Sequence, residues 1–163
     1  MSANSGAPAQ SGGRPTLLQA ALGYARKGWS VIPCAAGGKA PLIAGGHGWQ
    51  DGTTDVERIN RWWADEPRAN VGIVVGARSG LCVLDIDPRN GGDASLEQLT
   101  AEFGRPPATF TVMTGGGGWH YYFRHDPRAR NGKLLPGVEL KAASGYVIAP
   151  PSNHERGAYR WEI

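Results

Sequence analysis

Cysteine is scarce in this chain of 163 residues, and long apolar runs are missing. The two cysteines, Cys34 and Cys82, have no Cys-x-x-Cys spacing and no histidine-rich neighbourhood, which argues against a zinc site and against a disulfide framework. No apolar run approaches the roughly 18–20 residues of a membrane span, and the first residues lack the basic-then-apolar pattern of a secretory signal. We therefore expect a cytoplasmic protein with no membrane partner.

Glycine and proline are abundant instead, at 25 and 12 residues, and both favour many turns between short elements. At 40% hydrophobic residues the chain is long enough for one domain with a core, which we place at residues 16–163. Residues 1–15 are small, polar and rich in glycine and proline, so we predict a disordered lead-in there. The last five residues, YRWEI, fall inside a strand-like pattern, and we expect the domain to be part of a longer protein. A formal net charge of +3 fits a nucleic-acid or nucleotide partner without being specific for one.

The order of apolar and turn-forming residues predicts a mixture of helices and mainly antiparallel strands. Apolar residues at helical spacing predict three helices, at 16–28, 55–67 and 94–104. Residues 70–87 are predicted to form a hairpin of two apolar strands around the turn ARSG. Further strands are predicted at 29–33, 109–114, 119–124, 137–142, 145–150 and 158–163. The glycine-rich stretch 35–52 is predicted to be a long functional loop, and the whole order predicts an α+β fold.

The stretch LCVLDIDPRNGG (81–92) leads an apolar strand straight into two carboxylates, Asp85 and Asp87. Side chains alternate faces along a strand, so these two point the same way with Cβ atoms about 6–7 Å apart. Two anions this close repel each other unless a positive charge lies between them. The plain alternative is a pair of solvated carboxylates at the turn after a strand, and the spacing alone does not decide between the two.

Four successive glycines follow Thr114 in TGGGGWHYYF (114–123), between two predicted strands. Each costs about 0.5–1 kcal/mol of chain entropy relative to alanine, and a hairpin turn needs at most one or two. The excess favours a backbone that approaches a ligand closely, and concavities rich in amides suit phosphate oxygens. His120 begins the next strand, and we interpret it as a phosphate contact rather than a histidine satisfied within the sheet.

In GVELKA (137–142), strand alternation places Glu139 and Lys141 on one face. The simple interpretation is an exposed ion pair, worth roughly a few tenths of a kcal/mol. The functional interpretation makes Glu139 the third carboxylate of a cluster with Asp85 and Asp87, and Lys141 a phosphate contact. Such a cluster suits Mg²⁺ or Mn²⁺ because these ions prefer oxygen ligands.

Three further polar residues stand in short motifs that are ordinary when taken singly. Lys39 lies on the long first loop, in GGKAP (37–41). Ser152 and His154 follow a proline pair in APPSNH (149–154), which we expect to be extended. A surface lysine, a turn hydroxyl and a surface histidine are the plain interpretations.

Taken in order, these motifs resemble the N-terminal primase–polymerase domain of bifunctional replication proteins, in the archaeo-eukaryotic primase superfamily. The motifs are GW-V-P, GGKAP, NVGIVVG, LDID, T-GGG-H-YF, GVEL and GYVIAPPS-H--G-Y-W, and they run from residue 16 to the end of the chain. Their joint occurrence in this order is far more specific than any one of them. Proteins of this family are common in plasmids, phages and integrated elements.

The resemblance implies an RRM-like, mainly antiparallel catalytic sheet with helices, packed against a second small α/β lobe. It also implies a nucleotidyltransferase, a DNA primase or polymerase in which a 3′-hydroxyl attacks the α-phosphate of a bound (d)NTP. The implied partners are the (d)NTP, a single-stranded or primed DNA template, and a helicase domain or protein in the full-length replication protein.

Carried onto this chain residue by residue, the resemblance gives each motif a role. The implied catalytic and metal-binding carboxylates are Asp85, Asp87 and Glu139, which hold two divalent ions, Mg²⁺ or Mn²⁺. His120 is the implied contact to the triphosphate. The other implied nucleotide-binding residues are Lys39, Thr114, Gly116, Gly117, Gly118, Lys141, Ser152 and His154. We further expect four basic residues to follow the template backbone: Arg124, Arg128, Arg130 and Lys133.

The chain departs from the family pattern at two positions, and two other function classes stay open. Glu139 stands where aspartate is more usual, and Gly116 stands where serine is common. One alternative is a metal-dependent phosphodiesterase or nicking nuclease that uses the same carboxylates, although the sequence has no His-x-His motif. The other is a non-catalytic nucleic-acid-binding adaptor of replication, against which the carboxylates and the glycine run argue.

Overall fold

The computed structural model describes residues 13–163, so most of the predicted disordered lead-in lies outside the described residues. The helices are α1 (Leu17–Arg26), α2 (Val56–Asp65) and α3 (Gly92–Phe103), with short 3₁₀ helices η1 (Gly48–Asp51) and η2 (Pro88–Asn90). The longer strands are β1 (Val31–Cys34), β2 (Asn70–Val74), β3 (Leu81–Ile86), β4 (Thr111–Met113), β5 (Trp119–Arg124), β6 (Gly132–Leu135), β7 (Val138–Lys141) and β8 (Tyr146–Ala149). Three two-residue strands end the chain: β9 (Asn153–His154), β10 (Gly157–Ala158) and β11 (Arg160–Trp161). This mixture of helices and antiparallel strands confirms the predicted α+β class.

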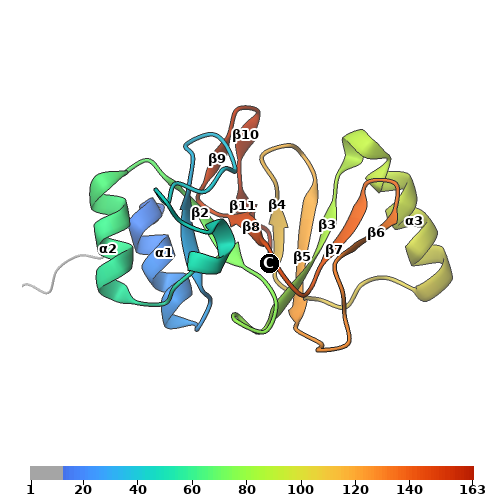
Figure 1. The fold of residues 1–163 in the computed structure, drawn as a ribbon. Helices are drawn as coiled ribbons and strands as arrows, with labels where there is room; N and C mark the ends of the chain where they lie inside the picture. The colour runs from blue at the N-terminus through green and yellow to red at the C-terminus, as the bar shows by residue number, and fades with distance from the viewer. Residues whose placement is uncertain (1–12) are drawn as a thin grey trace, which may run out of the picture.

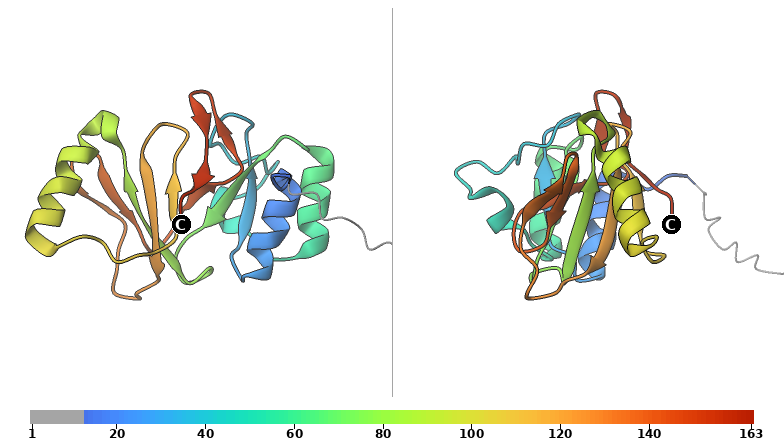
Figure 2. Two further views of the ribbon diagram at one scale, coloured as in Figure 1. Left: turned by 180° about the vertical axis from the view of Figure 1, so that it is seen from behind. Right: turned by 90° about the vertical axis from the view of Figure 1, so that its right-hand side faces the viewer.

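The strands form two larger antiparallel sheets and one small hairpin. The smaller sheet has the order β1-β2-β8, the six-stranded sheet has the order β11-β4-β5-β3-β7-β6, and β9 pairs with β10. Figure 1 shows α1 and α2 beside the smaller sheet at one end of the molecule, and α3 beside β3 and β7 at the other. The view from behind in Figure 2 shows the same separation of the helices. Within residues 13–163, none of the helices combines the length and apolar character that a membrane crossing demands.

The helices on the smaller sheet begin at side-chain caps that the sequence supplies. Thr16 and Gln19 form a capping box at the start of α1, in which each side chain accepts a hydrogen bond from the backbone N–H of the other, at 3.1 and 2.9 Å. Asp55 caps α2 by accepting from the backbone N–H of Arg58 at 2.7 Å. The predicted helix starts are therefore explained by satisfied backbone donors.

One hydrophobic cluster contains buried side chains of both larger sheets. Val31 and Ile73 enter it from the smaller sheet, while Val83, Val112 and Tyr122 enter it from the six-stranded sheet. Burying one of these side chains contributes about 1.5–3 kcal/mol, so the shared core is what holds the two sheets together.

The predicted hairpin at residues 70–87 is wrong, because its two strands belong to different sheets. Strand β2 pairs with β1 and β8, whereas β3 pairs with β5 and β7. All five residues of β2 are buried, so its apolar run lacks the alternation that would have indicated its partners. The intervening turn is fixed instead by Arg78, whose guanidinium donates to the carbonyls of Gln50 at 2.6 Å and Gly52 at 3.0 Å.

Other differences lie in the second half of the chain. Strand β6 was not predicted, because its glycine and partly exposed residues give it no apolar alternation and its pairing with β7 defines it. The predicted strand at 158–163 is split between β10 and β11, with Tyr159 between them. The chain turns at Pro150 and Pro151 rather than staying extended there.

Candidate functional site

The acidic pair and the distant motifs meet on the six-stranded sheet. Asp85 on β3 lies directly opposite Glu139 on β7 and, on its other side, directly opposite His120 on β5. Lys133 on β6 extends this row, because it lies opposite Glu139. Residues directly opposite each other in antiparallel strands share one face, with Cβ atoms about 4.5–5.5 Å apart. The structure therefore brings four strands' polar side chains into one line.

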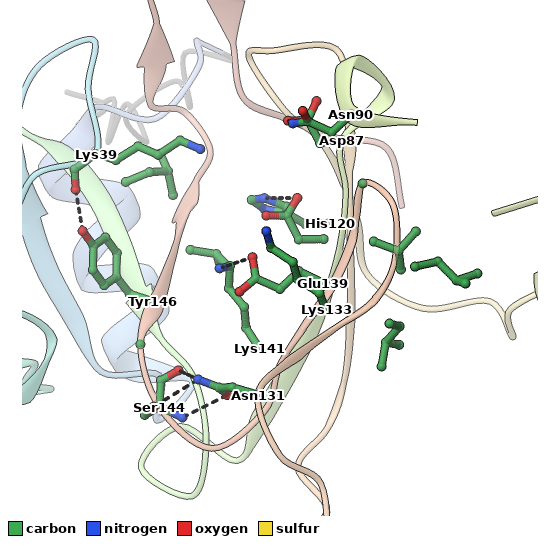
Figure 3. A pocket seen from close by; sticks show the side chains of 18 of the residues that line it. Lys39, Asp87, Asn90, His120, Asn131, Lys133, Glu139, Lys141, Ser144 and Tyr146 are labelled. Atoms are coloured by element: carbon green, nitrogen blue, oxygen red, sulfur yellow. Dashed lines mark hydrogen bonds and ion pairs between the residues drawn. The ribbon is translucent and has the colours of Figure 1, made fainter. Parts of the chain in front are cut away.

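This row faces a cavity of about 900 Å³ that lies between the two larger sheets. Three lysines line the cavity together with the three predicted carboxylates: Lys39, Lys133, Lys141, Asp85, Asp87 and Glu139. Figure 3 shows Lys39 extending into this space from one side, while His120 and Glu139 lie on the other. A cavity of this volume falls in the usual range of about 300–1,000 Å³ for small-molecule sites.

Asp87 lies just beyond the end of β3 and caps η2. Its Oδ1 accepts from the backbone N–H and the Nε of Arg89, at 3.1 and 3.0 Å. Its Oδ2 accepts from Nη2 of Arg89 at 3.0 Å and from Nδ2 of Asn90 at 2.8 Å. These bonds, above all those from the guanidinium, hold the pKa of Asp87 below its ordinary value. Asp87 is therefore ionised and fully hydrogen-bonded by its own turn.

Asp85 and His120 lie in a drier environment than Asp87. Burial raises the pKa of Asp85, although the positive charges of Lys141 and Lys39 oppose that shift. His120 is 5% exposed, and burial together with the same two lysines lowers its pKa to about 3. The Nε2 of His120 lies 3.6 Å from Oδ1 of Asp85, which is longer than a hydrogen bond. The imidazole is therefore neutral at physiological pH.

Glu139 is engaged by a neighbouring lysine rather than by the other carboxylates. Its Oε2 accepts from Nζ of Lys141 at 3.1 Å. Among residues 13–163, no three His, Cys, Asp or Glu side chains are arranged so that they could hold a metal ion together. Asp85 and Glu139 are thus neighbours on adjacent strands, and Asp87 follows the end of β3. Glu139 and Asp87 would each have to leave a cationic partner to share an ion.

The glycine run forms a tight turn between β4 and β5, and most of its glycines have a structural reason. The backbone N–H groups of Gly117 and Gly118 bond back to the carbonyl and the hydroxyl of Thr114, at 3.0 and 2.9 Å. Gly117 has a φ of 86°, and a Cβ on Gly118 would lie 2.1 Å from the carbonyl oxygen of Ile86. Gly116 differs, because a Cβ there would meet only side-chain atoms, the nearest being Nη2 of Arg89 at 3.6 Å.

A smaller cavity of about 50 Å³ joins this turn to the acidic residues. Six predicted nucleotide-binding or catalytic residues line it besides Asp85 and Asp87: Lys39, Thr114, Gly116, Gly118, His120 and His154. Ser152 lies elsewhere, since it is fully buried and its hydroxyl accepts from the backbone N–H of Val71 at 2.8 Å. The structure therefore gives Ser152 a bond that holds the turn after β8 to β2, and it does not bring this residue to either cavity.

Sequence reasoning missed several residues that line the cavities, chiefly Arg89, Asn90, Tyr146 and Tyr159. Tyr159 lines both and packs against His120, with ring centroids 6.1 Å apart. Strand alternation in AYRWEI would place Tyr159 and Arg160 on opposite faces, but that pattern does not indicate which face meets the site. Tyr146 donates its hydroxyl to the carbonyl of Lys39 at 2.8 Å and so supports the loop that carries this lysine.

The basic residues expected along the template are divided by the structure. Lys133 lines the larger cavity. Arg128 forms an ion pair with Asp126 at 2.7 Å, and Arg130 donates to the carbonyls of Pro127 and Ala129. Arg124 is an exposed residue at the end of β5.

Comparison with known proteins identifies the family of the chain. No curated protein matches the chain. A family model described as "Bifunctional DNA primase/polymerase, N-terminal" matches residues 21–162. This range includes the predicted residues that line the two cavities. On this match the chain belongs to the Prim-Pol family of bifunctional DNA primase/polymerase N-terminal domains.

Proposed function

We propose that this domain catalyses template-directed nucleotidyl transfer as a DNA primase or polymerase. A 3′-hydroxyl attacks the α-phosphate of a bound (d)NTP, a phosphodiester bond forms, and the bond to the departing pyrophosphate breaks. The observation that carries the proposal is the row of Glu139, Asp85 and His120 on neighbouring strands, facing a lysine-lined cavity in a chain of the Prim-Pol family.

The carboxylates are the right kind of ligand for a divalent cation. Asp85, Asp87 and Glu139 offer hard oxygen donors, which suit Mg²⁺ or Mn²⁺. Asp85 supports this most directly, because it lines both cavities and its Oδ1 lies 3.6 Å from the neutral His120, too far for a hydrogen bond. Two such ions, when bound, would lower the pKa of the attacking hydroxyl and neutralise charge on the leaving pyrophosphate.

The remaining side chains supply charge and position to the nucleotide. Lys39 and Lys141 line the cavity that the carboxylates line, so they can hold a triphosphate next to them. The backbone of Lys39 is held in place by Tyr146, whose hydroxyl donates to the carbonyl of Lys39 at 2.8 Å. The neutral imidazole of His120 can donate one N–H to a phosphate oxygen without bringing a further charge.

Several finer predictions stay predictions under this proposal. They are the RRM-like nature of the larger sheet, a distinct second lobe, the two-metal arrangement, and the assignment to a plasmid, phage or integrated element. The DNA template and a helicase partner belong with them. Each goes beyond membership of the family.

Metal-dependent primer extension on a primed single-stranded template tests the proposal. With Mg²⁺ or Mn²⁺, the wild-type protein should incorporate nucleotides, and Asp85→Asn should reduce incorporation by about a hundredfold or more without unfolding. Glu97→Gln, on the exposed side of α3, is the matched control and should extend normally. Template cleavage with no need for a triphosphate would favour a nuclease instead. Triphosphate and DNA binding with no incorporation would favour an adaptor.

A further inference from the structure

Arg89 is a charged residue of the small cavity to which the sequence interpretation gave no role. It follows Pro88 in η2 and lines the cavity with Thr114, Gly116 and Gly118. Its guanidinium lies beside the position that a Cβ of Gly116 would occupy, 3.6 Å from Nη2 and 3.7 Å from Cζ. Gly116 needs no positive φ, and a Cβ there would meet no backbone atom, so the glycine of the turn that could carry a side chain faces this arginine.

The partner of Arg89 is the carboxylate of Asp87. Nε and Nη2 of the guanidinium reach the two different oxygens of that carboxylate, both at 3.0 Å. Two more donors, the backbone N–H of Arg89 and the side chain of Asn90, complete the set. An ionised carboxylate offers about four lone-pair positions, so a cation can reach Asp87 only when one of these donors leaves.

The same fork occurs a second time in the chain, and it separates local geometry from function. In Asp126-Pro127-Arg128 the guanidinium reaches the two oxygens of Asp126 at 3.0 and 2.7 Å, and the backbone N–H of Arg128 adds a bond of 2.8 Å. The sequence Asp-Pro-Arg thus makes this fork by itself. Both arginines are exposed, and what distinguishes Arg89 is its place, because it lines the smaller cavity whereas Arg128 lines neither cavity.

We propose that Arg89 binds the β- or γ-phosphate of the incoming triphosphate and, before the substrate arrives, occupies the metal-binding position of Asp87. This inference rests on the proposed function. The exchange is balanced: the cation replaces the guanidinium on Asp87, and a phosphate replaces Asp87 on the guanidinium. The parallel N–H groups that now grip a carboxylate fit two phosphate oxygens equally well. Metal and triphosphate then bind cooperatively, because each releases the partner that the other needs.

Binding measurements without DNA test the exchange, with Mn²⁺ alone and inorganic tripolyphosphate alone as the probes in calorimetry. Arg89→Ala should bind Mn²⁺ about two- to fivefold more tightly than the wild type, because a competitor for Asp87 is gone. The same variant should bind tripolyphosphate about tenfold more weakly, because a charge-assisted contact is lost. A merely structural arginine would not move the two affinities in opposite directions.

Two further variants complete the design. Arg128→Ala removes the matched fork and should leave both affinities unchanged in this assay. Asp87→Asn should tighten metal-free tripolyphosphate binding, and most of that gain should vanish in the double variant Asp87→Asn/Arg89→Ala. A gain that survives in the double variant would be loss of a negative charge alone, and it would overturn the proposal.

The remaining outcomes are also decisive. If Arg89→Ala weakened the binding of both probes, Arg89 would support the fold of the site. If it changed neither affinity, the bonds between Arg89 and Asp87 would stabilise only their own turn, as those between Arg128 and Asp126 do. Either result overturns the inference about Arg89. The proposed function would still stand as long as the wild type binds both Mn²⁺ and tripolyphosphate. A wild type that binds neither Mn²⁺ nor tripolyphosphate would contradict the proposed function itself.

Discussion

Asp85 and His120 occupy directly opposite positions on neighbouring strands, with His120 Nε2 3.6 Å from Asp85 Oδ1. The distance is too long for a hydrogen bond, so the pair is close without being bonded. Nδ1 of His120 is buried and has no hydrogen-bond partner among the described residues. An unpaired buried polar atom costs about 1–3 kcal/mol, which a residue selected for the stability of the sheet would avoid. The missing hydrogen bond favours a role for His120 in binding a ligand.

The first prediction concerns His120→Gln, which keeps a side-chain donor but removes the ring. We expect triphosphate affinity to fall about tenfold while Mn²⁺ affinity stays within a factor of two, because the ring is proposed to contact phosphate and not the metal. Calorimetry with a non-hydrolysable (d)NTP analogue and with Mn²⁺ alone measures both. An unchanged nucleotide affinity would assign His120 a structural role beside Tyr159.

A second prediction separates two glycines of the same turn. A Cβ on Gly118 would lie 2.1 Å from the carbonyl oxygen of Ile86, so Gly118→Ala must shift backbone and should destabilise the fold by about 1–3 kcal/mol. Gly116→Ala places its Cβ at an ordinary 3.6 Å from Arg89, so the free energy of unfolding should stay within about 0.5 kcal/mol. Urea unfolding of both variants measures the difference. Equal destabilisation would show that the turn tolerates neither.

A third prediction follows from the position of Glu139. Because it lies opposite Asp85 and on the cavity wall, Glu139→Gln should weaken Mn²⁺ binding by about tenfold. Lys141→Met removes the cation that now holds Glu139 and should not weaken Mn²⁺ binding, since it frees the carboxylate. Calorimetry with Mn²⁺ measures both. A loss of affinity in Lys141→Met alone would mean that the carboxylate needs the lysine to stay in place.

Strand alternation made part of this site predictable. It placed Asp85 and Asp87 on one face and His120 with Tyr122, and the structure has His120 and Tyr122 buried on the inner face of β5. The sequence did not indicate which strands are neighbours, because strand pairing depends on the packing of the shared core rather than on the local residue pattern. The wrong hairpin at 70–87 shows this, since its two strands are largely apolar runs whose local pattern does not indicate which strands they pair with.

Residues that act through a turn were the hardest to foresee. Arg89 looks in the sequence like any arginine after proline, and only the tertiary position of η2 beside the glycine turn distinguishes it from Arg128. Ser152 is the opposite case, because its motif predicted a nucleotide contact but its buried hydroxyl accepts a hydrogen bond from the backbone N–H of Val71. Periodicity describes faces of strands well, but it does not describe which loops meet.

A fourth prediction concerns Ser152→Ala. The hydroxyl of Ser152 is fully buried and accepts from the backbone N–H of Val71, so the change leaves that donor unpaired. We expect a loss of about 1–3 kcal/mol in the free energy of unfolding. Triphosphate affinity, measured well below the midpoint of thermal unfolding, should be unchanged, because Ser152 lines neither of the two cavities at the site. A stable variant with weakened nucleotide binding would return Ser152 to the nucleotide site.

A fifth prediction concerns the thiols. Cys34 and Cys82 are both free and buried, and burial raises the pKa of Cys34 from 9.0 to about 12. The reactive species is the thiolate, so at pH 8 neither thiol should react with a thiol reagent until the chain unfolds. As pH rises above 9.0, the unfolded chain loses the Cys34 proton first, so the contribution of this residue to stability declines towards pH 12. Urea unfolding should therefore show a steeper alkaline loss of stability in the wild type than in Cys34→Ala, and equal slopes would contradict a buried neutral thiol at this position.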